Sequence, residues 1–192
     1  ADGRWYTGSG IYRNVTLVSL PKLHIPIWGT YVTTPEITDQ AAKVRIQTKI
    51  ENQLTMRAGF KLRTVILDAG GRQVASRTDD QSLEAGKSGE FTLELLVDRP
   101  LLWGCEHPHL YRARTTLTLE GQVVDEYETR FGIRQLRFAV GEGFFLNGKP
   151  TLMKGVCLHH DGGLVGAAVP KGVWRRRFAE LKAAGVNAIR TS

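Results

Sequence analysis

The sequence predicts a mainly β protein, in which an antiparallel β-sandwich is followed by one β-α-β unit. Apolar and polar residues alternate over most of residues 11–138, which is typical of strands with one buried and one solvent-facing side. Turn signals rich in glycine and proline separate these runs. After Phe138 the pattern changes to a strand-like run, a loop, a helical run and a second strand-like run.

The alternation defines the strands of the sandwich. It is clearest at 44–50, 91–97 and 113–119, and it begins as early as Ile11. The run at 60–67 is more continuously apolar, so we expect it in a central strand.

Turns are predicted between these strands, and they lie at 68–71, 84–89, 99–100 and 120–121. About seven short strands with such spacing favour a sandwich of immunoglobulin type. The disulfide that joins the sheets of antibody domains is missing, because Cys105 and Cys157 lie in different segments and are interpreted as free thiols.

The segment after Phe138 contains the β-α-β unit. Asn147-Gly148 predicts a tight hairpin over 143–148, and residues 151–156 predict a buried strand. A loop at 157–169 precedes the helix. The helix is indicated by Pro170 in its first turn, by an apolar stripe of Trp174, Phe178 and Leu181, and by Gly185 as its C-terminal cap. Residues 186–190 predict a second strand, parallel to the first.

Polar side chains follow the two predicted parallel strands. His159, His160 and Asp161 come after the first strand, and Arg190 ends the second. Neighbouring strands lie about 5 Å apart, and β/α barrels place their active sites at the carboxyl ends of their strands. Histidine and aspartate suit sugar hydroxyls, and arginine binds a carboxylate. A polar loop with Arg190 in a structural salt bridge is an equally good interpretation of the sequence.

Other chemistries have less support. His159, His160 and Asp161 are possible metal ligands, but adjacent histidines point apart, so we expect neither a metal nor another cofactor. Cys157 has no base placed beside it. No pair of carboxylates lies on the predicted parallel strands, as hydrolysis of a glycoside requires, so we expect no catalytic residue in this chain.

The net charge is +7, from 26 basic and 19 acidic residues. The basic residues are spread along the chain, and their one dense group, 175–177, lies on the predicted helix without interleaved aromatic residues. We therefore expect no nucleic acid partner. No apolar run approaches the roughly 20 residues that span a bilayer, and the sequence does not indicate a compartment.

Several longer motifs occur in a fixed order. They are Ser9-Gly-Ile-Tyr-Arg-Asn-Val15, Leu102-Trp103 with Pro108-His-Leu-Tyr111, Phe131-Gly-Ile-Arg134, Phe145-Leu-Asn-Gly-Lys-Pro150 with Lys154-Gly-Val156, and Asn187-Ala-Ile-Arg-Thr-Ser192. Together they resemble glycoside hydrolase family 2, the group of β-galactosidases, β-glucuronidases and β-mannosidases. Cys105-Glu-His107 departs from the residues common in that family after the tryptophan.

The resemblance implies a domain organisation. Residues 1–20 would be the tail of an N-terminal jelly-roll domain and a linker, 21–138 an immunoglobulin-like sandwich, and 139–192 the first β-α-β segment of a (β/α)8 barrel. The resemblance also implies retaining hydrolysis by two glutamates that lie further along the barrel.

The resemblance also gives the site residues their roles. His159 matches a histidine lining the sugar site, and Arg190 matches an arginine close to the nucleophile. His160 and Asp161 belong to a His-His-Asp-Gly-Gly form found in β-galactosidase-like members.

The leading hypothesis is a non-catalytic segment of a β-glycosidase, with β-galactosidase as the first expectation and β-glucuronidase or β-mannosidase as alternatives. Because the sequence stops inside the last motif, we expect no turnover from the chain alone. Its expected partners are the jelly-roll and barrel domains of the same chain, and a β-linked galactoside or related glycoside in the full-length enzyme. The sandwich would then space the two domains.

A hypothesis of a different class is an autonomous carbohydrate-binding sandwich. It would require exposed aromatic residues aligned on one sheet face or on loops. The sandwich offers Trp28, Tyr31, Trp103 and Tyr111, and their strand and turn contexts predict core or corner positions.

Overall fold

The computed structural model describes residues 10–191, so the expected opening segment at 1–9 and the last residue, Ser192, lie outside the described part. The chain divides into two compact units. The sandwich unit is Ser19–Pro150, and the β-α-β unit combines the residues up to Val18 with those from Thr151 onward. The domain boundaries expected after residues 20 and 138 stay a prediction. None of the described helices has the length and apolar content needed to cross a membrane.

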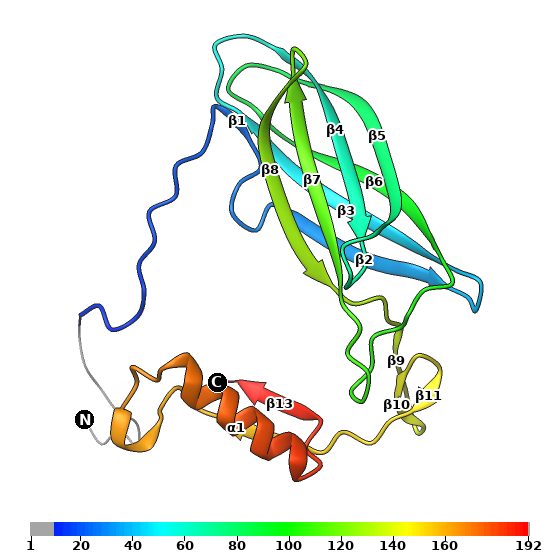
Figure 1. Cartoon of the computed structure of the whole chain (residues 1–192), viewed down its shortest axis with the longest axis vertical. Coiled ribbons are helices and arrows are strands. Elements are labelled where there is room, and N and C mark those ends of the chain that lie inside the picture. The colour runs from blue at the N-terminus through cyan, green and yellow to red at the C-terminus, as the bar shows by residue number, and fades with distance from the viewer. Residues whose placement is uncertain (1–9, 192) are drawn as a thin grey trace. The chain divides into compact units, whose positions relative to one another are not determined.

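Two antiparallel sheets form the body of the sandwich unit (Figure 1). In one sheet β3 pairs with β1, β2 and β6, and the other has the order β5-β4-β7-β8. The strands are β1 (Leu23–His24), β2 (Thr30–Ile37), β3 (Ala41–Asn52), β4 (Ala58–Leu67), β5 (Gln73–Leu83), β6 (Ser88–Asp98), β7 (Tyr111–Leu119) and β8 (Gln122–Phe131). The mainly β sandwich predicted from the alternation is confirmed.

The buried core lies between the sheets and follows the period of two. Along β3 the side chains of Val44, Ile46 and Ile50 are fully buried while their neighbours face outward. β4 is an interior strand, as predicted for 60–67, but it alternates too, because Lys61 and Arg63 are exposed. The run looks continuously apolar because of its C-terminal end. There a bulge in the pairing with β5 places two consecutive buried residues, Ile66 and Leu67.

Tyr111 forms a tyrosine corner at the start of β7. Its hydroxyl accepts a hydrogen bond from the Leu101 backbone N–H at 2.9 Å, and its side chain is buried beside Phe131. This arrangement is a hallmark of immunoglobulin-like sandwiches. The corner position predicted for Tyr111 is therefore correct.

The alternation that begins at Ile11 does not form a strand. Residues 10–22 lie outside the strands, and the side chains of Ile11, Val15 and Leu17 are 83%, 77% and 97% exposed. A strand needs a neighbour with which to exchange backbone hydrogen bonds, and no described strand pairs with this segment.

A small sheet of β9 (Leu136–Ala139), β10 (Gly143–Leu146) and β11 (Lys149–Pro150) ends the sandwich unit. Asn147 and Gly148 have φ of 52° and 75°, which matches the predicted hairpin turn. The Asn147 amide donates to the Trp103 carbonyl at 2.9 Å and accepts from the Gln135 N–H at 2.9 Å. The hairpin is therefore fixed to the loop that carries Trp103.

The β-α-β unit contains β12 (Gly155–Leu158), the 3-10 turn η1 (Gly163–Val165), α1 (Lys171–Ala183) and β13 (Ala188–Thr191). The helix ends as predicted, because Gly185 has φ 83° and its N–H donates to the Lys182 carbonyl at 3.0 Å, while Val186 N–H donates to Leu181. The first strand is shifted from the predicted 151–156 and is not buried, because it has one described partner strand.

Candidate functional site

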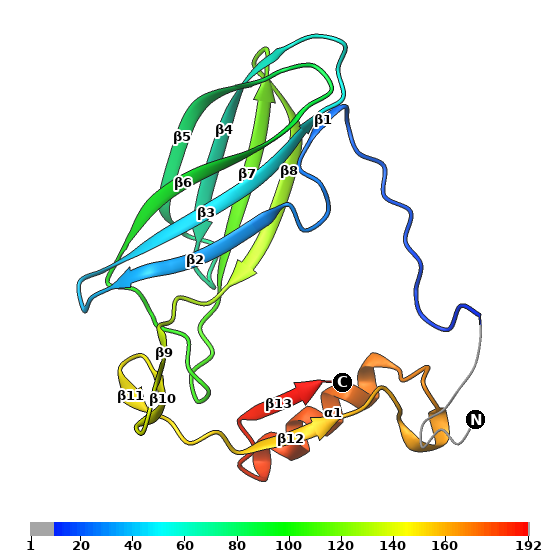
Figure 2. The ribbon, with the colours of Figure 1, turned by 180° about the vertical axis from the view of Figure 1, so that it is seen from behind.

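The two parallel strands bring the predicted site residues to one edge. β12 and β13 pair in register, with Cys157 opposite Arg190 and Leu158 opposite Thr191. Figure 2 shows the strands side by side, with α1 over one face. His159 directly follows β12 and Arg190 is one residue from the end of β13, so their backbones lie at the carboxyl ends of both strands.

Arg190 extends from the exposed part of this edge. Residues paired in register point to the same face of a sheet, so Arg190 shares a face with Cys157. No ion pair of Arg190 occurs among residues 10–191, and its side chain is exposed.

The loop after β12 holds His159, His160 and Asp161 in half-buried positions. The Asp161 backbone carbonyl accepts a hydrogen bond from Arg177 Nη1 of α1 at 2.9 Å. Gly162 packs so closely that a Cβ there would lie 2.7 Å from the side chain of Val169, which is itself buried. The helix and the buried valine therefore shape the loop.

The N-terminal part of the β-α-β unit also contacts this loop. Arg13 Nη2 donates to the Ala167 carbonyl at 3.2 Å, and the Arg13 guanidinium lies 5.6 Å from the ring centre of Tyr12. Residues from opposite ends of the chain thus meet at the loop that carries the predicted site.

Asn187 sets the register of the two strands, and sequence reasoning missed it. Its amide donates to the Leu152 carbonyl at 2.9 Å and accepts from the Lys154 N–H at 2.8 Å. Lys154 therefore bonds to a side chain, and β12 begins one residue later. The sequence did contain a signal for this role. Asn187 lies between the capping glycine of the helix and the next strand, where an asparagine side chain can hydrogen-bond to backbone groups.

The chemistry available at this edge is hydrogen bonding and positive charge. Asp161 has one other described carboxylate in its unit, Glu180, which lies on α1 and pairs with Arg176 at 3.5 Å. A retaining glycosidase needs two carboxyl groups about 5 Å apart. Among the described residues no three histidine, cysteine, aspartate or glutamate side chains gather in a way that could hold a metal ion.

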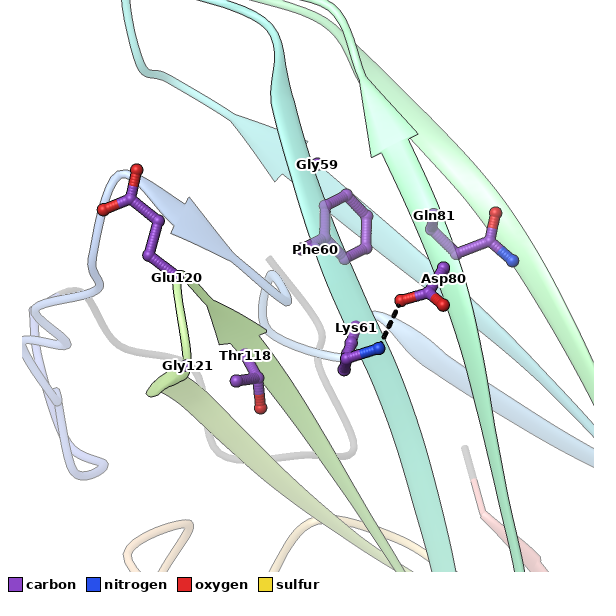
Figure 3. Close-up of a pocket in the computed structure, with 8 residues that line it drawn as sticks. All are labelled: Gly59, Phe60, Lys61, Asp80, Gln81, Thr118, Glu120 and Gly121. Atoms are coloured by element: carbon purple, nitrogen blue, oxygen red, sulfur yellow. Dashed lines mark hydrogen bonds and ion pairs between the residues drawn. The ribbon is translucent and has the colours of Figure 1, made fainter.

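A separate depression of about 340 Å³ lies at one end of the β5-β4-β7-β8 sheet (Figure 3). Lys61 and Asp80, which line it, pair with each other at 2.7 Å, and Glu120 points away from them. Because Lys61 and Asp80 pair with each other, we propose no ligand for this depression.

The aromatic residues of the sandwich correct one expectation. Trp28 and Tyr31 are 90% and 65% exposed, so the core or corner positions predicted for them are wrong. Both line one groove of about 350 Å³. The turn before β2 places Trp28 outward with φ 59°, a conformation that the alternation of residue types does not reveal.

The fold defines an immunoglobulin-like sandwich followed by a parallel β-α-β unit, and two family models match these parts in order. The model of glycosyl hydrolases family 2 matches residues 24–134. The model of the TIM barrel domain of the same family matches residues 139–192. The chain belongs to glycosyl hydrolase family 2.

Individual proteins agree with this assignment. The chain is 39% identical to the beta-galactosidase BoGH2A of Bacteroides ovatus over 100% of its own length and 22% of that protein. A crystal structure of a family 2 member from Bacteroides cellulosilyticus covers 98% of this chain at 38% identity and a TM-score of 0.91, and 26% of that chain is matched. A Bacteroides uniformis beta-glucuronidase structure covers 90% at 31% identity and a TM-score of 0.81, with 22% of it matched. The chain thus spans about a fifth of the length of the curated relatives it matches.

Proposed function

We propose that this chain forms the immunoglobulin-like domain and the first β/α unit of the barrel in a retaining β-glycosidase that removes terminal β-linked sugars. The observation that carries the proposal is the pair of family models that match consecutive segments in the family's order. Residues 1–20 would then end the jelly roll, 21–138 would be the sandwich and 139–192 would begin the barrel.

In this proposal His159, His160, Asp161 and Arg190 bind the sugar. The half-buried loop residues hydrogen-bond to hydroxyl groups, and the exposed guanidinium of Arg190 stands beside the nucleophilic carboxylate supplied by a later barrel strand. A guanidinium in that position keeps a carboxylate ionised, which the nucleophilic step requires.

The sandwich would act as a spacer between the jelly roll and the barrel. A spacer needs a rigid exit, and the hairpin that precedes Thr151 is fixed to the sandwich by the two hydrogen bonds of Asn147.

A β-galactoside is the first expected substrate, because BoGH2A, named a beta-galactosidase, is similar over the whole chain. A β-glucuronide is the second candidate, supported by the structural similarity to the Bacteroides uniformis beta-glucuronidase. A β-mannoside is the third and follows from the family resemblance alone.

Assays of the complete product of the gene that encodes this chain test the proposal. We expect hydrolysis of p-nitrophenyl β-glycosides, with the galactoside preferred over the glucuronide and mannoside, and release of the sugar with its anomeric configuration retained in proton NMR. The 192-residue chain in the same assay should give no turnover. Turnover by the chain alone, or a complete product inactive on all three sugars, would contradict the proposal.

A further inference from the structure

The turn before β2 holds Trp28 in a position that the fold alone does not explain. The Gly29 N–H donates to the Pro26 carbonyl at 2.8 Å, and Trp28 inside this turn has φ 59° with a side chain 90% exposed. Left-handed backbone is unfavourable for a bulky aromatic residue, and glycine or asparagine usually takes such a position. An exposed tryptophan held in an unfavourable backbone conformation therefore suggests that its indole ring binds a ligand.

The backbone beneath Trp28 is anchored to two strands. Its N–H donates to the Tyr127 hydroxyl of β8 at 3.0 Å, and the Gly29 carbonyl accepts from the Lys49 N–H of β3 at 2.7 Å. A Cβ on Gly29 would lie 2.7 Å from the Pro26 carbonyl, so the turn has no room to widen. The indole is thus carried on a fixed support, which reduces the entropy lost when a ligand binds.

Trp28 and Tyr31 line a groove whose other side is polar. The groove has a volume of about 350 Å³ and includes Gln47, Lys49 and Glu90 from β3 and β6. This volume falls at the lower end of the roughly 300–1,000 Å³ typical of ligand sites. Tyr31 pairs in register with Gln47, so both side chains stand on the same outer face of the sheet.

The polar groups of the groove are suited to hydroxyl groups. Gln47 Nε2 donates to Glu90 Oε1 at 2.8 Å, which orients the amide and leaves its oxygen as an acceptor. Lys49 stands opposite Glu90 in register and lies 3.4 Å from a carboxylate oxygen of Glu51. Donors and acceptors therefore lie beside two exposed aromatic rings.

The charge of the groove favours a neutral ligand over an anionic one. Its lining carries one lysine and one glutamate, and Glu51 beside Lys49 adds a further negative charge. Phosphate-bearing ligands are bound by an excess of positive charge. A neutral ligand with one apolar face and many hydroxyl groups matches both the rings and the polar side.

We propose that this groove binds a neutral saccharide, with a pyranose ring stacked on the Trp28 indole and its hydroxyls hydrogen-bonded to Gln47, Lys49 and Glu90. The site lies wholly within the sandwich unit. The proposal rests on the groove and does not depend on the glycosidase function proposed above.

Titration of the isotope-labelled 192-residue chain with tetrasaccharides tests the proposal. The probes are β-1,4-galactotetraose, cellotetraose and, as a charged counterpart, tetragalacturonate. We expect at least one neutral probe to produce saturable NMR shifts at the Trp28 indole N–H and the Gln47 amide, and the charged probe to bind more weakly. The absence of saturable shifts at about 10 mM of both neutral sugars overturns the proposal.

Variants separate binding by the ring from effects on folding. Trp28→Asn suits the left-handed turn, so its thermal midpoint should equal or exceed that of the wild type while saccharide affinity falls at least about tenfold. Phe138→Ala removes an aromatic residue that is 72% exposed outside the groove and should leave affinity unchanged. Equal affinity of Trp28→Asn and wild type overturns the proposal. So does self-association through Trp28 in ultracentrifugation, because the groove would then be an interface between copies.

Discussion

Trp103 joins two motifs that are distant in the sequence. Its N–H donates to the Ile133 carbonyl at 2.8 Å, and the Arg134 guanidinium lies 4.8 Å from the centre of its ring. Gly132 packs directly against the indole, so that a Cβ there would lie 2.6 Å from the Trp103 Cβ. The glycine of the Phe-Gly-Ile-Arg motif is therefore required by the tryptophan of the Leu-Trp motif.

Substitution of this glycine should destabilise the sandwich. We expect Gly132→Ala to lower the free energy of unfolding by about 1–3 kcal/mol, because Trp103 must move out of its place. Gly104→Ala is the matched control, since its Cβ would have no neighbour within 4 Å. Urea denaturation of both variants measures the difference, and equal stabilities would show that Trp103 is not tightly held.

At the residue scale the sequence predicts positions that depend on local chemistry. Asn147-Gly148 and Gly185 take the left-handed backbone expected of them, because their residue types favour it. Trp28 takes the same conformation against its own preference, because its N–H donates to the Tyr127 hydroxyl and the carbonyl of the next residue, Gly29, accepts from the Lys49 N–H. Hydrogen bonds between residues so distant in the sequence cannot be predicted from a local sequence pattern.

At the scale of elements, the β12–β13 pair depends on one side chain. Asn187 bonds to Leu152 and Lys154 through its amide, and its backbone N–H also donates to the Lys154 carbonyl at 3.1 Å. The residue before β13 is therefore hydrogen-bonded to the segment that leads into β12. The register that places Arg190 near the loop at His159 follows from this contact.

Loss of the Asn187 amide should loosen this pair without affecting the sandwich. Two hydrogen bonds contribute about 1–3 kcal/mol together, so Asn187→Ala should speed amide hydrogen exchange in β12 and β13 by about tenfold or more. Exchange in β3 and β7 should stay as in wild type, because they belong to the other unit.

Asn14→Ala is the control for this exchange experiment, since Asn14 is exposed and lies outside any strand. Similar exchange rates in the two variants would show that Asn187 does not hold the register.

The elements of the sandwich were predictable because alternation and turn chemistry act locally. Whether a predicted strand has a neighbouring strand with which to pair was not predictable. The run from Ile11 has a strand-like pattern but no described strand to pair with, and 151–156 lost its first residues to the Asn187 contacts. Whether a periodic run becomes a strand depends on neighbours that periodicity does not specify.

At the scale of the whole molecule, the proposed sugar site would need more strands than β12 and β13. β12 and β13 carry no carboxylate, and retaining hydrolysis requires two of them on opposite sides of the glycosidic bond. The proposed roles of His159, His160, Asp161 and Arg190 therefore concern binding and positioning. The sequence predicts these residues by their place after parallel strands, the structure brings their backbones to the same edge, and their role stays a prediction.

The measurement that tests the account most directly is kcat/KM of the complete gene product carrying Arg190→Ala, compared with Arg175→Ala. Arg175 is an exposed arginine of α1 and serves as the matched control. We expect Arg190→Ala to lower kcat/KM by about 100-fold or more, because a positive group beside the reacting carboxylate is lost, and Arg175→Ala to leave it unchanged. Equal kcat/KM values for the two variants would contradict the placement of Arg190 in the sugar site.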